Sequence, residues 1–497
     1  MRAMKGLLLG TAAGFAAFAS AQAADLPVKA RPVEYVKVCN QYGAGFFYVP
    51  GTDTCLKIGA YIRTQHAYGN LASINGAENF TASGTRSPLG TGVAPGGAQD
   101  FYSYQDRILL TTDWRTQSDY GVIRAYAAIL ANQGTRDNQP TWSSAGVGGV
   151  LRAFIQFAGF TIGHAVSYFD FTAYNNYGYL PPMTASTGVN GIDVVAYTAQ
   201  LGNGWSASID LEDGQSGQGR AHNEYSFGDP VGPAWSTASV AEAAWSPDVA
   251  GNIRVDQQWG SAQISGALHN ASAGYYTTSP GGGIPGGLTV SGHPGDTWGW
   301  AVQGALRLTN FLMPKDTIEG SIGYSSAATG YTTGVGGVQL YGSGNSVAVA
   351  SAPDTLFTTG GSQEAINAWH IDGAYEHVWN PQWATSVFAE YVGINYSSGA
   401  KNIVSAGCAA GTLFAAGSVV TNCNPDWSMY QVSTRTRWNP RPELEIGLDL
   451  IWLHTNTAFS GSTVVLPTTG ARPAGPYAVE DQDKYMAILR LVKNILP

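Results

Sequence analysis

His164, Ser167 and Asp170 form the closest approach to a catalytic constellation in this sequence. A serine beside a histidine and a carboxylate could serve as the nucleophile of a hydrolase, because the histidine takes the hydroxyl proton and the carboxylate orients the ring. The spacing of these three residues prescribes no triad geometry, and the chain contains no G-x-S-x-G, H-E-x-x-H or P-loop motif. We therefore expect neither an enzymatic site nor a cofactor.

Four cysteines form two local pairs, Cys39 with Cys55 and Cys408 with Cys423. In an exported chain such pairs can persist as disulfides, each closing a short loop. The alternative is a zinc site, but neither pair has a second close cysteine or a histidine at ligand spacing. We expect two local disulfides and no metal.

The composition restricts the class of protein that could position these residues. Only 12% of the residues are charged, against a usual share of about 25%. After the N-terminus no run of about 18 apolar residues is present, so helical membrane spans are not available. A membrane protein with this sequence would have to be a β-barrel, and its 14 Trp, 26 Tyr and 17 Phe suit the aromatic girdles of such barrels.

The N-terminus has the pattern of a secretory signal. Arg2 and Lys5 precede a largely apolar run over residues 6–19, and an A-x-A cleavage pattern follows. We expect a signal peptide over residues 1–23, with cutting one residue later as the alternative, and a mature chain over 24–497. Cleavage would leave 23 basic and 34 acidic residues. This acidic balance argues against nucleic acid as a partner.

Strand-sized segments recur from residue 55 onward, and the connections between them alternate between very short and very long. The short connections lie at 117–118, 158–159, 202–204, 259–261, 309–314, 380–381 and 439–442, and Gly, Asn and Pro supply much of their turn chemistry. The long connections lie at 69–100, 132–150, 166–190, 213–250, 272–296, 327–363, 398–424 and 456–478. This alternation predicts an all-β transmembrane antiparallel barrel of about 16 strands, with turns at one rim and loops at the other.

Side chains within the predicted strands alternate in polarity. In the first strand, Leu56, Ile58, Ala60 and Ile62 alternate with Lys57, Gly59, Tyr61 and Arg63. The same division recurs at 205–212, 253–259 and 443–452. A lipid-facing and a water-facing side would produce this pattern. A soluble β-sandwich could produce it too, but loops that are long on one side only favour the barrel.

Closure of the barrel requires its first and last strands to pair, because an open edge cannot stay unpaired in hydrocarbon. We expect the strand at 485–493 to pair with the strand at 55–68. The lipid-facing side chains of the last strand should then be Tyr485, Ala487, Leu489 and Leu491.

The stretch ADLPVKARPVEYVKVCNQYGAGFFYVPGTDTCLKIGAYIRTQ resembles the start of the mature general porins of alphaproteobacteria. Further similar blocks follow in order, among them YGVIRAYAAIL, AFIQFAGFTIGHAVSYFDF, YTAQLGNGWSASIDLED and DWSMYQVSTRTRWNP. The resemblance implies a homotrimer of sixteen-stranded outer-membrane barrels, each pore narrowed by an inward-folded third loop. One departure is the C-terminus, which ends Asn494, Ile495, Leu496, Pro497, whereas such porins commonly end on an aromatic residue.

For a pore, the working chemistry is a constriction whose opposed charges set a transverse field. The early strands offer Arg63, Arg107, Arg115, Arg124 and Arg152 as lumen residues. The loop at 166–190 would fold inward as the constriction loop and carries Asp170, with neighbouring aromatic residues as bulk. Alternatively, any single arginine could be a rim or interface residue, and Asp170 could accept a hydrogen bond that anchors the loop.

The sequence thus predicts a water-filled channel for passive diffusion of small hydrophilic solutes and ions, in contact with outer-membrane lipid and lipopolysaccharide. A substrate-specific channel and an adhesin or receptor barrel remain alternatives. Acidic residues of the outer loops, including Glu224, Asp229, Glu242 and Asp354, are expected to raise the local cation concentration over about 8 Å at physiological salt. The ion preference of the pore stays open.

Overall fold

The computed structural model describes most of the chain after the N-terminal segment. The described residues are 37–69, 102–134, 149–171, 177–180, 183, 187, 191–213, 224–227, 246–273, 292–334, 338–343, 346–358, 360–466 and 474–496. The predicted signal peptide and its cleavage site lie outside them.

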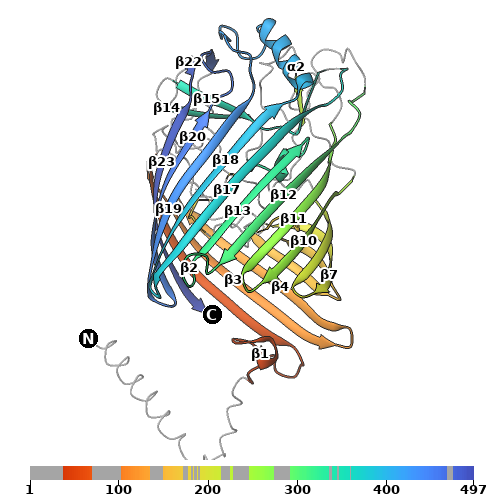
Figure 1. Cartoon of the computed structure of the whole chain (residues 1–497), viewed down its shortest axis with the longest axis vertical. Helices are drawn as coiled ribbons and strands as arrows, with labels where there is room; N and C mark the ends of the chain where they lie inside the picture. Colours follow the sequence, from red (N-terminus) through yellow and green to blue (C-terminus); the bar gives the residue numbers. More distant parts are fainter. Residues whose placement is uncertain are drawn as a thin grey trace, which may run out of the picture.

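Sixteen strands in the described part of the chain form one closed antiparallel barrel (Figure 1). The wall strands are β2 (Cys55–Gly69), β3 (Tyr102–Ser118), β4 (Gly121–Gly134), β5 (Val150–Phe157), β6 (Phe160–Ala165), β7 (Ile192–Gly202), β8 (Trp205–Glu212), β10 (Asp248–Gln257), β11 (Gly260–Ala271), β12 (Thr297–Thr309), β13 (Thr317–Ser326), β17 (Glu364–Asn380), β18 (Trp383–Tyr396), β19 (Trp427–Arg441), β20 (Leu444–Asn456) and β23 (Gln482–Leu496). Each pairs with its neighbours in chain order, with β8 next to β10 and β13 next to β17. The predicted fold class is confirmed.

The predicted closure is also confirmed, because β2 pairs with β23 from Ala60 opposite Leu496 to Gly69 opposite Met486. The turn between β7 and β8 shows how local sequence sets the register. Asn203 and Gly204 have φ angles of 51° and 78°, as the two-residue turns of tight hairpins require. Some strand boundaries differ from the prediction. β10 ends at Gln257 and Trp259 lies in the following turn. The turn expected at 117–118 lies at 119–120 instead, because Ser118 still pairs with Gly121.

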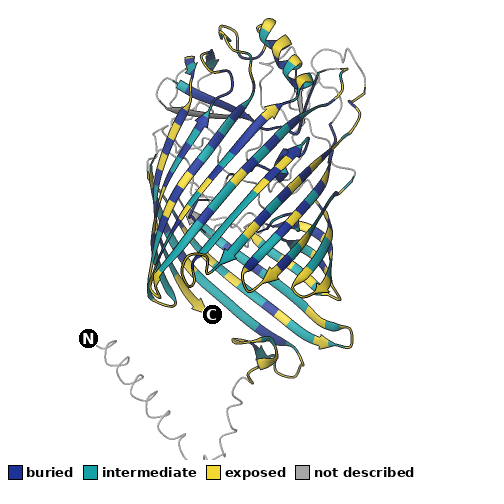
Figure 2. Cartoon of the chain, in the orientation of Figure 1, coloured by how far each residue is buried: buried dark blue, intermediate teal, exposed yellow. Residues whose placement is uncertain are grey.

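Successive side chains of the wall strands alternate between the outer surface and the lumen, which gives the ribbon its alternating colours in Figure 2. In β8, Ile209 and Leu211 are exposed on the outside, whereas Asp210 is buried on the inside. In β23, Leu489 is exposed and Arg490 is buried. The predicted lipid face of the last strand is therefore confirmed.

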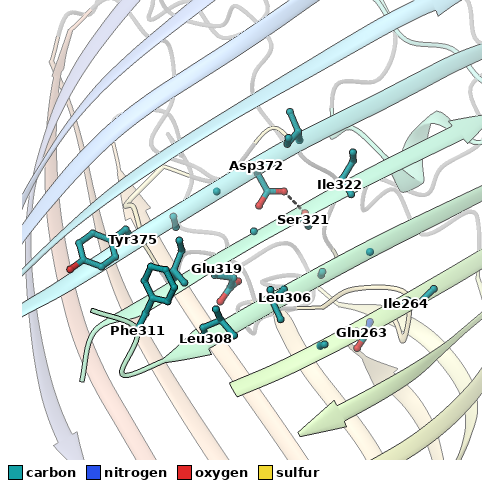
Figure 3. A pocket seen from close by; sticks show the side chains of 18 of the residues that line it. Gln263, Ile264, Leu306, Leu308, Phe311, Glu319, Ser321, Ile322, Asp372 and Tyr375 are labelled. Atoms are coloured by element: carbon teal, nitrogen blue, oxygen red, sulfur yellow. Dashed lines mark hydrogen bonds between the residues drawn. The ribbon is translucent and has the colours of Figure 1, made fainter. Parts of the chain in front are cut away.

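A hollow of about 920 Å³ lies over β11, β12, β13 and β17, and Figure 3 shows the side chains that line it. Apolar side chains line most of it, including Ile264, Leu306 and Ile322, all of which are exposed. The alternate residues of the same strands turn to the lumen, where Ser321 donates a hydrogen bond to Asp372. An outer surface of this kind suits contact with lipid acyl chains.

A small disulfide-bonded unit precedes the first wall strand. It contains the 3-10 helix η1 (Asn40–Tyr42) and the strand β1 (Phe47–Tyr48), which pairs with β2. The predicted Cys39–Cys55 disulfide is present, with 6.0 Å between the Cα atoms. The guanidinium of Arg115 lies 4.9 Å from the ring centroid of Phe46, which attaches this unit to β3.

Loops at the opposite rim carry further secondary structure. It comprises β9 (Glu224–Phe227), η3 (Thr329–Tyr331), β14 (Val338–Ser343), β15 (Ser346–Ser351), β16 (Thr355–Thr358), α2 (Ser398–Ala409), β21 (Thr463–Leu466) and β22 (Gly475–Val479). The predicted Cys408–Cys423 disulfide joins the end of α2 to the following segment. No helix of the described residues is long and apolar enough to cross a membrane.

Candidate pore constriction

The segment between β6 and β7, called loop 3 here, folds into the lumen rather than away from the barrel. Its first residues run along the inner wall beside β10 and β11. Asn252 donates a hydrogen bond to the carbonyl of Tyr168 over 2.5 Å. Arg254 donates to the carbonyl of Phe171 over 3.1 Å, and its guanidinium lies 5.0 Å from the Phe171 ring centroid. Lumen-facing side chains of the wall therefore hold the backbone of loop 3.

The later part of loop 3 reaches a distant stretch of the wall. The Tyr177 hydroxyl donates to Glu319 of β13 over 3.1 Å. The backbone nitrogen of Met183 donates to Glu390 of β18 over 2.7 Å. The described residues of loop 3 are therefore attached to lumen-facing side chains of β10, β13 and β18.

Tyr179 is the most firmly held residue of the loop. Its backbone nitrogen donates to Asp449 over 2.5 Å and its hydroxyl donates to Glu445 over 2.9 Å. Arg490 donates to its carbonyl over 3.0 Å and places its guanidinium 4.0 Å from the ring centroid. The guanidinium of Arg435 lies 5.5 Å from the centroid of the same ring. This one residue therefore joins loop 3 to β19, β20 and β23.

Two of the predicted arginines, Arg63 and Arg107, are partners in the register of β2 and β3. Arg63 is only 8% exposed and donates to Gln105 over 2.8 Å. Arg107 donates to Asn132 of β4 over 2.7 Å. Arg490 joins this basic cluster because its Nε donates over 2.9 Å to Gln65, which is itself bonded to Gln105.

The other predicted arginines have separate surroundings. Arg124 and Arg115 both bind the carboxylate of Asp113, at 3.0 and 2.8 Å. Their charges are therefore partly balanced at the turn end of β3 and β4. Arg152 of β5 lies within electrostatic range of Asp170. The Asp170 carboxylate accepts bonds from the nitrogen and hydroxyl of Thr187, so Asp170 also fixes the shape of loop 3.

The residues considered for catalysis are directed to different partners. His164 lies 3.4 Å from Asp193 on the outer surface. Ser167 is buried in loop 3, where its hydroxyl accepts a bond from the nitrogen of Phe169. Asp170 binds Thr187, as described above. Within the described residues, no group of three or more His, Cys, Asp or Glu residues is placed to hold a metal ion.

A family model described as the porin subfamily matches residues 25–487. The chain belongs to the porin subfamily. Porin Omp2b of Brucella suis is 30% identical over 264 residues, which cover 52% of this chain and 64% of that porin. Porin Omp2b of Brucella abortus (strain 2308) is 30% identical over 267 residues with the same coverage.

Among solved structures, the outer membrane channel DcaP of Acinetobacter baumannii shares the fold, with a TM-score of 0.51 and 13% identity. The similarity covers 90% of this chain and 99% of that one. The Brucella matches span just under two thirds of those porins' length. Family and fold together place this porin in the outer membrane as an integral β-barrel.

The sequence did not predict the acidic stretch of the inner wall that holds the later part of loop 3. The carboxylates that hold loop 3 are Glu319, Glu390, Glu445 and Asp449, from β13, β18 and β20. Glu445 and Asp449 do share the charged face of the alternating pattern in their strand, which was a usable signal. Their partners in loop 3 could not be read from the pattern, because a loop has no periodicity.

The expectation for Asp354 was wrong. This residue was expected to stand on an outer loop and attract cations, but it is 1% exposed. Its carboxylate accepts bonds from the backbone nitrogen and hydroxyl of Thr329, at 2.5 and 2.9 Å. Burial alone would raise the pKa of Asp354, but the nearby His269 ring and the bonds from Thr329 hold it below its ordinary value. Asp354 is therefore an ionised structural anchor. Asp229 and Glu242 lie outside the described residues.

Proposed function

We propose that this porin forms a water-filled channel through which small hydrophilic solutes and ions diffuse passively, and that it is a channel rather than an enzyme. The observation that carries the proposal is loop 3, which folds into the lumen and is held there by hydrogen bonds to charged side chains of β10, β13, β18, β20 and β23. A barrel of about 16 strands is wide enough to hold an aqueous passage. A loop fixed inside that passage would narrow it and so limit the size of the solutes that pass.

The charge arrangement supports a transverse field at loop 3. On one side, the carboxylates of Glu319, Glu390, Glu445 and Asp449 accept hydrogen bonds from loop 3. Arg63 and Arg107 stand side by side on β2 and β3, and Arg152 of β5 lies in the electrostatic range of Asp170 within the loop. We propose Arg63, Arg107, Arg124, Arg152 and Asp170 as constriction residues. In a narrow eyelet such charges are incompletely screened, so they act strongly on a passing ion.

Proteoliposome swelling with uncharged sugars of graded size tests the proposed function. We expect the rate to fall smoothly with solute size. A sharp preference for one sugar would instead support a substrate-specific channel. A folded barrel that gives neither swelling nor ion conductance would refute the channel and favour an adhesin or receptor barrel.

We further propose a homotrimer, with the outer face of β2 to β7 as the contact between copies. Asp106 is exposed on the same outer face of β3 as Ile108 and Leu110. Asp193 and His164 form a second outward polar pair on β7 and β6. Charges in contact with lipid destabilise a barrel, so a second copy is a better neighbour for this face.

A bulky substitution on this face tests the trimer. Ala127 lies on the outer side of β4, where small side chains would allow close approach. Ala127→Trp should convert the trimer to folded monomers on semi-native gels. Val302→Trp is the matched control, because Val302 faces outward on β12, nearly opposite in the barrel. If both variants stay trimeric, or if the parent protein is monomeric, the contact is elsewhere or absent.

A further inference from the structure

The strand β15, in the loop between β13 and β17, is buried on both of its faces. Val347, Ala348, Val349 and Ala350 are each at most 1% exposed. Successive side chains of a strand point to opposite sides, so a strand on an open outer surface would expose every second one. This loop, called loop 6 here, therefore has packed protein on both sides at the outer mouth of the barrel.

One side of this packing is the barrel wall itself. The lumen-facing residues near the outer ends of the wall strands are apolar and fully buried there: Ile366, Val392, Ile394, Met429, Leu453 and Ile488. They belong to one hydrophobic cluster with the side chains of β15. The interior of a water-filled barrel is normally polar. This sector of the mouth is therefore filled with side chains instead of water.

Backbone hydrogen bonds hold β15 in this position. The nitrogen of Ala458 donates to the carbonyl of Val349, and the nitrogen of Glu480 donates to the carbonyl of Val347, both over 2.9 Å. Both donors belong to the segment between β20 and β23. Trp427, at the start of β19, donates its indole N–H to the carbonyl of Ser351 over 2.7 Å.

The other end of loop 6 is fixed to a different stretch of the wall. Asp354, three residues after Ser351, has its carboxylate 3.6 Å from the ring of His269 on β11. His269 in turn binds Asp248 of β10 over 2.8 Å. The backbone at this end lies beside β17, because the nitrogen of Ile366 donates to the carbonyl of Asp354 over 3.0 Å and Thr355 pairs with Ala365. The backbone of loop 6 is therefore held beside β17, and the side chain of Asp354 connects it to β11 through His269.

We infer that loop 6 is a second, outer constriction, which excludes bulky hydrophilic solutes before they reach loop 3. This inference rests on the proposed channel function. Loop 6 and the apolar wall residues packed against β15, called the apolar seat here, confine the water path to the remaining sector of the mouth. The two constrictions act in series, so that the outer one selects by width and the inner one by width and charge.

A charge placed in the apolar seat tests the inference. Val349→Glu should displace β15, because a buried carboxylate without a partner is strongly disfavoured. Val419→Glu is the matched control, because Val419 is 60% exposed on the neighbouring loop. The measurements are liposome swelling with a small and a bulky sugar, and heat-modifiable migration to verify folding. We expect Val349→Glu to raise the rate for the bulky sugar severalfold relative to the small one, and Val419→Glu to leave the ratio unchanged.

Equal ratios in the two folded variants would overturn the second constriction while leaving the channel intact. Absence of any flux through the folded parent protein would instead refute the proposed function. If Val349→Glu does not fold, hydrogen exchange of the parent protein decides. The amides of residues 347–350 should then exchange as slowly as those of the wall strands, and exchange as fast as in exposed turns would overturn the inference.

Discussion

Removing the Tyr179 hydroxyl should loosen loop 3 without removing bulk from the lumen. Tyr179→Phe keeps the ring against Arg490 and the backbone bond to Asp449, and loses only the 2.9 Å bond to Glu445. A hydrogen bond to a charged group contributes about 1.5–3 kcal/mol. The lower value applies because Glu445 is partly exposed and also lies 3.5 Å from Arg437. About 1.4 kcal/mol is a tenfold change in an equilibrium constant. The fraction of molecules in which Tyr179 is detached from the wall should therefore rise roughly tenfold.

Two further variants extend this prediction. Tyr179→Ala also removes the ring contacts with Arg490 and Arg435, each worth up to about 2 kcal/mol when desolvated. Its effect should therefore be larger than that of the phenylalanine variant. Gly447→Ala disturbs the same contact from β20, because a Cβ at Gly447 would overlap the Tyr179 hydroxyl.

Single-channel recording in planar bilayers is the appropriate assay. We expect brief increases in conductance that become more frequent from the parent protein to Tyr179→Phe and then to Tyr179→Ala, with Gly447→Ala also raised. Tyr120→Ala is the control, since Tyr120 is 80% exposed in a short turn. If all folded variants gave the steady conductance of the parent protein, Tyr179 would not be the anchor of a constriction loop.

Three other predictions concern charge, membrane contact and the loop disulfide. Arg107→Glu should shift the reversal potential in a salt gradient toward cations. Arg441→Glu, at an exposed residue of the rim, should shift the reversal potential much less. Equal shifts would show that Arg107 does not line the constriction. Leu489→Arg should cost about 2–4 kcal/mol near the bilayer midplane and impair heat-modifiable folding, and normal folding would contradict the register of β23. Replacing Cys408 and Cys423 by serine should remove up to about 3 kcal/mol of local stability and speed amide exchange in α2, with the barrel unaffected; unchanged exchange would show that the disulfide does not hold the helix.

The wall of this porin follows directly from its sequence because two simple rules act on every strand. Lipid on one side and water on the other impose a period of two, so the alternating pattern alone assigns Leu489 and Arg490 to opposite faces. Asn203 and Gly204 favour a tight turn, which fixes where β7 ends and β8 begins. Cysteine spacing in an exported chain predicts the pairing of Cys39 with Cys55, and the disulfide is present.

The inner surfaces of the loops could not be predicted in the same way. Loop 3 was expected to fold inward only through family resemblance, and its aromatic residues were treated as bulk. Tyr179 instead combines three hydrogen bonds and two cation–π contacts in one residue. One of these contacts joins residues 270 positions apart in the chain, and a periodic pattern carries no information about such pairs.

Loop 6 illustrates a signal that the alternating pattern does contain. On the lumen side of β18, Phe388 lies between polar Ser386 and Glu390, and beyond Glu390 the next two lumen positions, Val392 and Ile394, are both apolar. Lumen water cannot favour that change, because exposing an aliphatic side chain to water is unfavourable. Something apolar must cover these positions, and the side chains of β15 in loop 6 do so. A polar-to-apolar change along the lumen face of a barrel strand therefore predicts where an outer loop folds back inside.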